Sequence, residues 1–240
     1  MDGLAAMAPV TMKAGVRVLR PLLTVPREQL RALLHARGQD WIEDPSNRDE
    51  RYLRVQVREA LPHLAEFGLS RDRLVETASA MARARVALDL ACDQAERTSV
   101  QWHEEGFARL ELQPFRALPD EIALRLLARL SKGVAGGTYA PRLSGLEKLL
   151  AAIRGPGLEG GRTFGGAKWM AAPGRAGARP RDEVLVLREV AALPPAGLQL
   201  KAGASALWDG RFRVTRAGGL RAGEVRPLGA SGLKQAVALD

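Results

Sequence analysis

A group of three arginines follows a short polar turn in the first quarter of the chain. The stretch reads "DWIEDPSNRDERYLRVQVREALPHL" from residue 40 to residue 64, and it contains Arg51, Arg54 and Arg58. On a helix, these three residues fall within about one sixth of the circumference. Like charges at such a spacing repel each other by roughly 0.2–0.5 kcal/mol per pair. The spacing therefore indicates that a counter-charge lies nearby.

Arg58 is the arginine for which the stretch offers no helical partner. Glu50 lies one turn before Arg54 and can pair with it, whereas positions 55, 61 and 62 around Arg58 hold Val, Leu and Pro. The counter-charge of Arg58 must then come from a distant carboxylate, from solvent or from a bound phosphate. A guanidinium binds carboxylate and phosphate oxygens as a planar, bidentate fork. Arg58 is therefore a candidate anion-binding residue.

Other residues of this stretch favour a purely structural role. Asp44 with Pro45 is typical of a turn, and Asn47 with Glu50 three residues later matches a capping box at a helix start. We predict that Asp44 and Asn47 are turn and cap residues. The apolar residues at helical spacing are expected to form the buried side of the helix. They are Leu53, Val57, Leu61 and Leu64.

The net charge of +9 is concentrated in the last third of the chain. Residues 1–64 hold 10 basic and 8 acidic residues, residues 65–155 hold 13 and 12, and residues 156–240 hold 13 and 7. This excess attracts a polyanion such as RNA, although a GC-rich genome, which favours arginine throughout its proteins, produces a basic chain as well. The basic side chains expected to be exposed on strands and loops are Arg162, Arg175, Arg179, Arg181, Arg211, Arg213 and Arg216.

Several other kinds of site are disfavoured. Cys92 is the single cysteine, and the three histidines lie on separate expected elements, so no metal site is predicted. "GPGLEG" has the glycine spacing of a dinucleotide loop, but it follows a helix and contains Pro156. The tryptophans 102, 169 and 208 favour core packing over stacking on bases. No membrane span or leader peptide is expected, and the cytoplasm is the expected location.

Hydrophobic periodicity predicts a helix-rich first two thirds and a β-rich remainder. We expect a strand in "VRVLRPLL", a helix in "TVPREQLRALLHARG" and a long helix from Ser70 to about Thr98, which is long enough to bridge two domains. A strand in "FARLELQ" precedes helices in "LPDEIALRLLARLSKG" and "RLSGLEKLLAAIRG". Strands follow in "RTFGGAKWMAA" and "DEVLVLREV", and Asp209-Gly210 predicts a hairpin turn in "ALWDGRFRVTR".

Several short motifs, in this order and spacing, resemble the tRNA(Ile)-lysidine synthetases, a family of ATP-pyrophosphatase-type ligases. "DGLAAM", "RPLL", "DWIEDPSN" and "RYLRVQVRE" resemble the end of the family's catalytic domain, and "TYAPRLSGLEKLL", "RTFGG" and "LVLRE" resemble its substrate-binding C-terminal region. The family adenylates the wobble cytidine of an isoleucine tRNA with ATP, after which the amine of free lysine displaces AMP. The resemblance implies ATP and Mg²⁺ for the full-length enzyme, and tRNA and L-lysine as its substrates.

The resemblance also implies roles for individual residues and for the domains. By the resemblance, Arg58 and Arg54 are expected to be catalytic. From their charge, Arg51, Arg162, Arg211 and Arg213 are expected to contact RNA. The implied fold is mixed α/β and helix-rich. Residues 1–66 correspond to the C-terminal remnant of a Rossmann-like domain, residues 67–192 to a mainly helical substrate-binding domain with a small sheet, and residues 193–240 to the start of a small β-rich domain.

The chain departs from the family pattern at three points. The ATP loop Ser-Gly-Gly-x-Asp-Ser does not occur, so the chain is expected to lack the N-terminal ATP loop, to hold no cofactor alone and to depend on a missing N-terminal half. Val55 replaces a usual asparagine, and Ala167 replaces a frequent cysteine. Two functions therefore stay open: part of a tRNA-modifying ligase that is inactive by itself, or a stand-alone RNA-binding or scaffolding module derived from that family.

Overall fold

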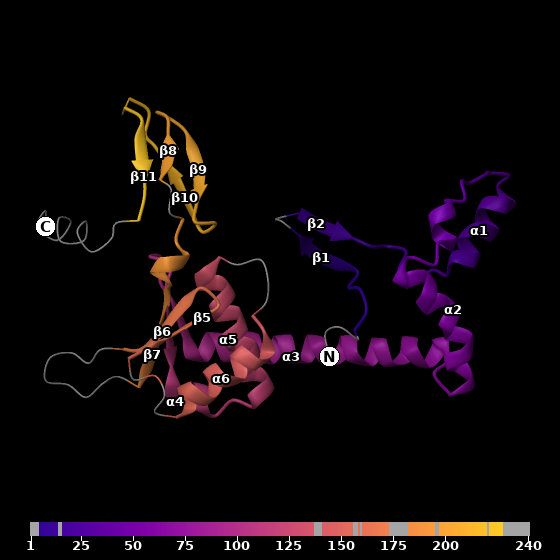
Figure 1. The fold of residues 1–240 in the computed structure, drawn as a ribbon, viewed down its shortest axis with the longest axis horizontal. Helices are drawn as coiled ribbons and strands as arrows, with labels where there is room; N and C mark the ends of the chain where they lie inside the picture. The colour runs from indigo at the N-terminus through magenta and orange to yellow at the C-terminus, as the bar shows by residue number, and fades with distance from the viewer. Residues whose placement is uncertain are drawn as a thin grey trace, which may run out of the picture. The chain divides into compact units, whose positions relative to one another are not determined.

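The computed structural model describes residues 5–13, 16–136, 141–155, 158, 160–172, 182–194, 197–219 and 221–227, except for the side chains of Arg48 and Arg54. The chain forms two compact units, unit 1 (Met1–Asp89) and unit 2 (Leu90–Asp240). The division falls within helix α3 (Arg71–Ser99), which confirms the long helix predicted from Ser70 (Figure 1). The division into three domains at residues 66 and 192 stays a prediction.

The described part of unit 1 contains a small antiparallel hairpin and three helices before α3. Strand β2 (Val16–Leu19) was predicted, and it pairs with β1 (Val10–Lys13), which was not. Helix α1 (Arg27–Ala36) follows Pro26, and the chain leaves it through Gly38, which adopts a positive φ of 63°. The remaining elements before α3 are the 3-10 helix η1 (Pro45–Arg48) and helix α2 (Leu53–Glu66).

The polar turn before α2 differs from the expected capping box. Asp44 occupies the N-cap of η1, where its carboxylate accepts a hydrogen bond of 2.9 Å from the backbone N–H of Ser46. Asn47 lies inside η1, and Tyr52 stands at the N-cap of α2 without a side-chain cap. The prediction that Asn47 caps this helix is therefore wrong, because Asp44 caps an earlier turn and α2 begins later than the pattern indicates.

Unit 1 buries little apolar surface. Among its described residues, only Ala5 and Val55 are buried hydrophobic residues. The predicted buried side of α2 is not buried: Leu53, Val57 and Leu64 are exposed, and Leu61 is half-buried. The prediction was wrong because helical spacing identifies an apolar side, whereas burial also requires an element packed against it.

Unit 2 has a continuous hydrophobic core between helices and a five-stranded antiparallel sheet of order β3-β4-β7-β6-β5. Phe115, Leu126, Leu130 and Trp169 are fully buried in this unit. Its helices are α4 (Leu112–Arg116), α5 (Asp120–Ala135) and α6 (Leu143–Arg154) (Figure 1). The strands are β3 (Val100–Trp102), β4 (Ala108–Glu111), β5 (Arg162–Phe164), β6 (Ala167–Ala171) and β7 (Glu183–Arg188).

Local sequence accounts for most of these elements. Helix α5 has acidic residues in its first turn, apolar residues at helical spacing, and Gly136 at a positive φ of 66° at its end. One expectation was incomplete: "RTFGGAKWMAA" forms two strands, because Gly165 and Gly166 both adopt positive φ angles and turn the chain between β5 and β6.

Two small antiparallel pairs complete the described part of unit 2. The predicted hairpin is confirmed: Asp209 and Gly210, both with positive φ, connect β9 (Ser205–Trp208) to β10 (Phe212–Thr215). Strand β8 (Leu198–Leu200) pairs with β11 (Gly223–Val225), and the 3-10 helix η2 (Val190–Ala192) precedes this pair. The architecture is mixed α/β. None of the described helices combines the length and the apolar character that a bilayer span needs.

Candidate anion-binding site

The three arginines of the opening stretch do not share one side of a helix. Arg51 precedes α2, and its guanidinium pairs with the carboxylate of Asp49 at 2.7 Å between Nη2 and Oδ2. The hydrogen bonds from the Arg51 side chain, and then from its backbone N–H, hold the pKa of Asp49 below its usual value. The backbone of Arg54 lies in α2, and its side chain lies outside the described part. Arg51 thus has a local acid partner.

Arg58 lies exposed on α2, and its side chain has no hydrogen bond or ion pair with any described residue. It lines an open groove with a volume of about 510 Å³. Helix α1 and the start of α3 contribute the other charged groups to this groove. The lining residues are Arg27, Glu28, Arg31, Val57, Arg58, Leu61 and Arg71. The structure therefore places four guanidinium groups around one hollow surface.

Glu43 holds two of these guanidinium groups. Its carboxylate accepts hydrogen bonds from Arg27 Nη2 at 3.4 Å, from Arg31 Nη2, and from Trp41 Nε1 at 2.9 Å. The guanidinium of Arg31 also lies 5.9 Å from the centre of the Trp41 ring. The hydrogen bond from Trp41, followed by the charges of Arg31 and Arg27, lowers the pKa of Glu43. Glu43 therefore fixes the α1 side of the groove.

This arrangement predicts a local acid transition at Glu43. Because its pKa is lower in the folded chain, the contribution of ionised Glu43 is complete above its ordinary pKa of 4.5 and is lost as pH falls through the lowered value. We expect the fluorescence of Trp41 to change in this range, measured as the difference between the native chain and Trp41→Phe. Glu43→Gln should abolish that change, and an unaltered transition in Glu43→Gln would contradict the assignment.

Arg71 resembles Arg58 in its surroundings. It is the first residue of α3, it is exposed, and its side chain has no polar contact with the described residues. On the other side of the groove, Nε of Arg31 is buried and has no hydrogen-bond partner among the described residues. Arg27, Arg31 and Arg71 were not among the residues expected from the sequence to bind an anion. The spacing of four between Arg27 and Arg31 was a usable signal, whereas nothing local connected Arg71 to Arg58.

The basic residues of unit 2 differ from one another in solvent exposure and in their contacts. Arg211 was expected to be exposed, but its side chain is only 11% exposed and binds the carboxylate of Asp209 at 2.8 Å. It also donates to the carbonyl oxygen of Gly106 at 3.0 Å. This expectation is therefore wrong, because a buried acid engages Arg211. Arg213 on β10 is exposed, and Arg162 on β5 lines a separate groove with Lys148. Arg175, Arg179 and Arg181 lie outside the described residues.

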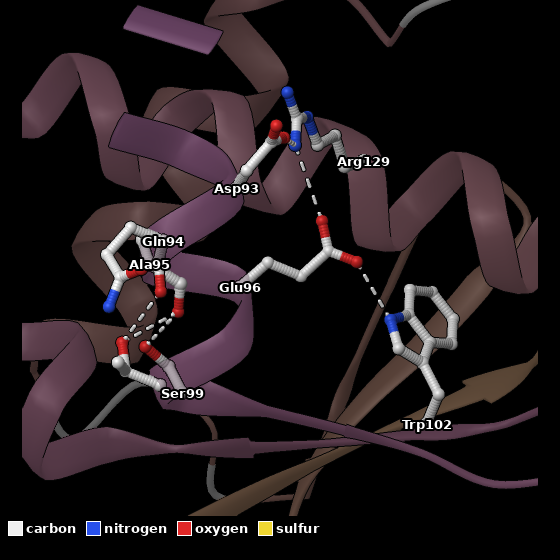
Figure 2. Close-up of polar contacts among 8 residues, drawn as sticks. Asp93, Gln94, Ala95, Glu96, Ser99, Trp102 and Arg129 are labelled. Atoms are coloured by element: carbon white, nitrogen blue, oxygen red, sulfur yellow. Dashed lines mark hydrogen bonds and ion pairs between the residues drawn. The ribbon is translucent and has the colours of Figure 1, made fainter. Parts of the chain in front are cut away.

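The tryptophans also differ in burial. Trp169 is fully buried, as expected for core packing, whereas Trp102 is 43% exposed. The indole Nε1 of Trp102 donates a hydrogen bond of 2.9 Å to Glu96, and Arg129 binds both Glu96 and Asp93 (Figure 2). The ring of Trp102 lies against Gly133, where an added Cβ would come within 2.5 Å of it. These contacts hold the ring in place, so Trp102 has a packing role at the surface.

Comparison with known proteins identifies a matching family model and several related sequences. Residues 1–64 match the family model of the PP-loop domain. The chain is 42% identical to the tRNA(Ile)-lysidine synthase of Ruegeria pomeroyi over 98% of its own length and 52% of the relative. It is 36% identical to the tRNA(Ile)-lysidine synthase of Methylobacterium nodulans over 69% of its length and 50% of that relative. It is 29% identical to the tRNA(Ile)-lysidine synthase of Wolbachia pipientis wMel over 90% of its own length and 48% of that relative.

The PP-loop match requires one correction. Residues 1–66 were expected to be the C-terminal part of the catalytic domain, without its N-terminal ATP loop. Residues 1–64 match the model of the PP-loop domain, so the expectation that the ATP-loop part is missing is wrong. The groove around Arg58 is built largely from this matched segment. The chain spans about half the length of the curated relatives it matches.

Proposed function

We propose that this chain is part of a tRNA(Ile)-lysidine synthetase, which ligates L-lysine to the wobble cytidine of an isoleucine tRNA with ATP. The observation that carries the proposal is the 42% identity to the Ruegeria pomeroyi synthase across nearly the whole chain. A relation of this extent includes both the PP-loop segment and unit 2. The proposal includes a cytoplasmic location, where tRNA is modified.

In the proposed reaction, ATP transfers its adenylyl group to the wobble cytidine and releases pyrophosphate. The amine of lysine then attacks the activated cytidine and displaces AMP. Arg58 binds phosphate or carboxylate oxygens of a substrate, since its guanidinium is exposed in the groove and has no described acid partner. A bidentate donor that is aimed at developing negative charge stabilises a transition state more than a point charge does. Glu43 supports this role by holding the neighbouring arginines of α1.

The full-length enzyme is expected to use Mg²⁺, but the described residues of this chain do not fit such an ion. Across the described ranges, no group of three or more His, Cys, Asp or Glu side chains is placed to hold a metal. The carboxylates next to the groove, Glu28 and Glu43, stand among arginines, and Glu43 is already bound to two of them. We therefore assign no step of the reaction on this chain to Mg²⁺.

The proposed function is tested by an activity assay of the chain alone and of a chimera. The chimera joins the chain to the part of the Ruegeria pomeroyi synthase that the match does not cover. We expect the chimera to release AMP only when lysine and isoleucine tRNA are both present. A different tRNA and the omission of lysine are the controls. If the chimera binds tRNA but never releases AMP in a lysine-dependent manner, the chain is an RNA-binding module.

A further inference from the structure

The groove between α1, α2 and the start of α3 contains four arginines, and the proposed function assigns a substrate-binding role to Arg58 alone. Four guanidinium groups meet two carboxylates, Glu28 in the lining and Glu43 beside it. Glu43 is taken up by Arg27 and Arg31. Arg58 and Arg71 have no described polar partner, so the groove keeps two guanidinium groups that can bind an anion.

The kind of anion follows from the donors. All four cations are arginines, whose planar forks match the oxygens of phosphate groups. Sites for nucleoside polyphosphates commonly add backbone N–H groups from a loop and a metal held by carboxylates. The lining of this groove comes from helical residues, and no metal-binding group occurs among the described residues. These features favour the separate phosphate groups of a polynucleotide backbone over the linked phosphates of a nucleoside polyphosphate.

The shape of the groove agrees with a nucleic-acid backbone. It is open, and its volume of about 510 Å³ exceeds what a single phosphate needs. The apolar side chains of Val57 and Leu61 lie among the charged ones. Positively charged grooves with apolar contacts for sugar and base are typical of proteins that follow an RNA strand without reading its sequence.

We propose that this groove binds the phosphodiester backbone of RNA next to the reacting nucleotide, with Arg71 as a phosphate contact beside Arg58. The inference takes from the proposed function only the identity of the RNA, which is tRNA. Glu28, the carboxylate in the lining, opposes this binding. Arg71 would then hold the RNA backbone in place, and its position as the first residue of α3 puts the start of that helix beside the bound RNA.

The test measures binding of a labelled tRNA to the 240-residue chain at several salt concentrations. Arg71→Gln should lower the slope of log K against log salt by about 0.7–0.9, the amount that one phosphate contact contributes. Arg83→Gln is the matched control, because Arg83 is also exposed on α3 but does not line the groove. It should leave the slope unchanged. Glu28→Gln should tighten binding by about two- to fivefold, as expected for one exposed charge.

A second measurement separates RNA from ATP as the source of the phosphate. Metal-free pyrophosphate is titrated against the native chain and Arg71→Gln, and we expect the same weak binding to both. An Arg71→Gln variant with the native salt slope overturns the proposal. If that variant also loses pyrophosphate binding, the groove is a polyphosphate site instead. None of these readouts needs ligation, so a chimera that fails to release AMP leaves the result on RNA binding standing.

Discussion

Replacing Asp209 by asparagine should lower the free energy of unfolding of unit 2 by about 3 kcal/mol. The Asp209 side chain is 3% exposed, and it binds Arg188 at 2.8 Å as well as Arg211. Asparagine keeps the size of the side chain and tolerates the positive φ of 50° at this position. The substitution therefore removes the charge and leaves the turn between β9 and β10 intact.

The cost arises because two guanidinium groups lose their carboxylate in a place with little solvent. Arg188 is 16% exposed, and it keeps hydrogen bonds to the carbonyl oxygens of Gly166 and Ala192. Arg211 keeps its hydrogen bond to Gly106. These bonds satisfy donors but supply no opposite charge. Breaking a buried ion pair from one side is costly for this reason, whereas losing an exposed pair costs at most about 1 kcal/mol.

Asp182→Asn provides the matched control for this prediction. Asp182 pairs with Arg116 at 3.0 Å in an exposed position, so the same chemical change should cost less than about 1 kcal/mol. Chemical denaturation followed by circular dichroism measures the free energy of unfolding of both variants, and a thermal melt measures their Tm. For a unit of this size, Asp209→Asn should lower Tm by about 6–12 °C. Equal effects of the two substitutions would show that the Arg188–Asp209–Arg211 cluster does not stabilise unit 2.

Arg58→Lys should lower the turnover of the active chimera by about 10- to 1000-fold, the range found for a lost electrostatic donor. Lysine keeps the positive charge but loses the bidentate fork, so the loss reports geometry and not net charge. The fold should be unaffected, because Arg58 is exposed and has no described polar contact. Steady-state kinetics of AMP release and a melting curve of the same preparation measure the two properties together.

Arg83→Lys is the control for Arg58→Lys. It makes the same change at an exposed position of α3 outside the groove, and we expect native turnover. A fall in Tm that accompanies the fall in turnover of Arg58→Lys would make Arg58 a structural residue. A turnover equal to that of Arg83→Lys would remove Arg58 from the reaction altogether.

Much of the secondary structure could be predicted from the sequence, because the signals are local. The apolar spacing of α5 and α6, the positive φ angles open to Asp209-Gly210, and the uninterrupted pattern of α3 each act within a few residues. The start of α2 was misplaced because two polar turn residues compete for the cap. Asp44 caps η1, so the helix begins six residues after Asn47.

The sequence by itself determined the resemblance to the lysidine synthetases, the mixed α/β class and the unusual position of Arg58, since motifs and helical spacing are properties of short segments. Only the tertiary structure decided which charges meet. It placed Arg71 and Arg27 in the groove of Arg58, and it buried Arg211 against Asp209 and Gly106. The physical reason is that the free energy of a charge depends on its distance to partners and on its solvent exposure. When those partners are far away in the chain, as Gly106 is 105 residues from Arg211, only the fold sets both quantities.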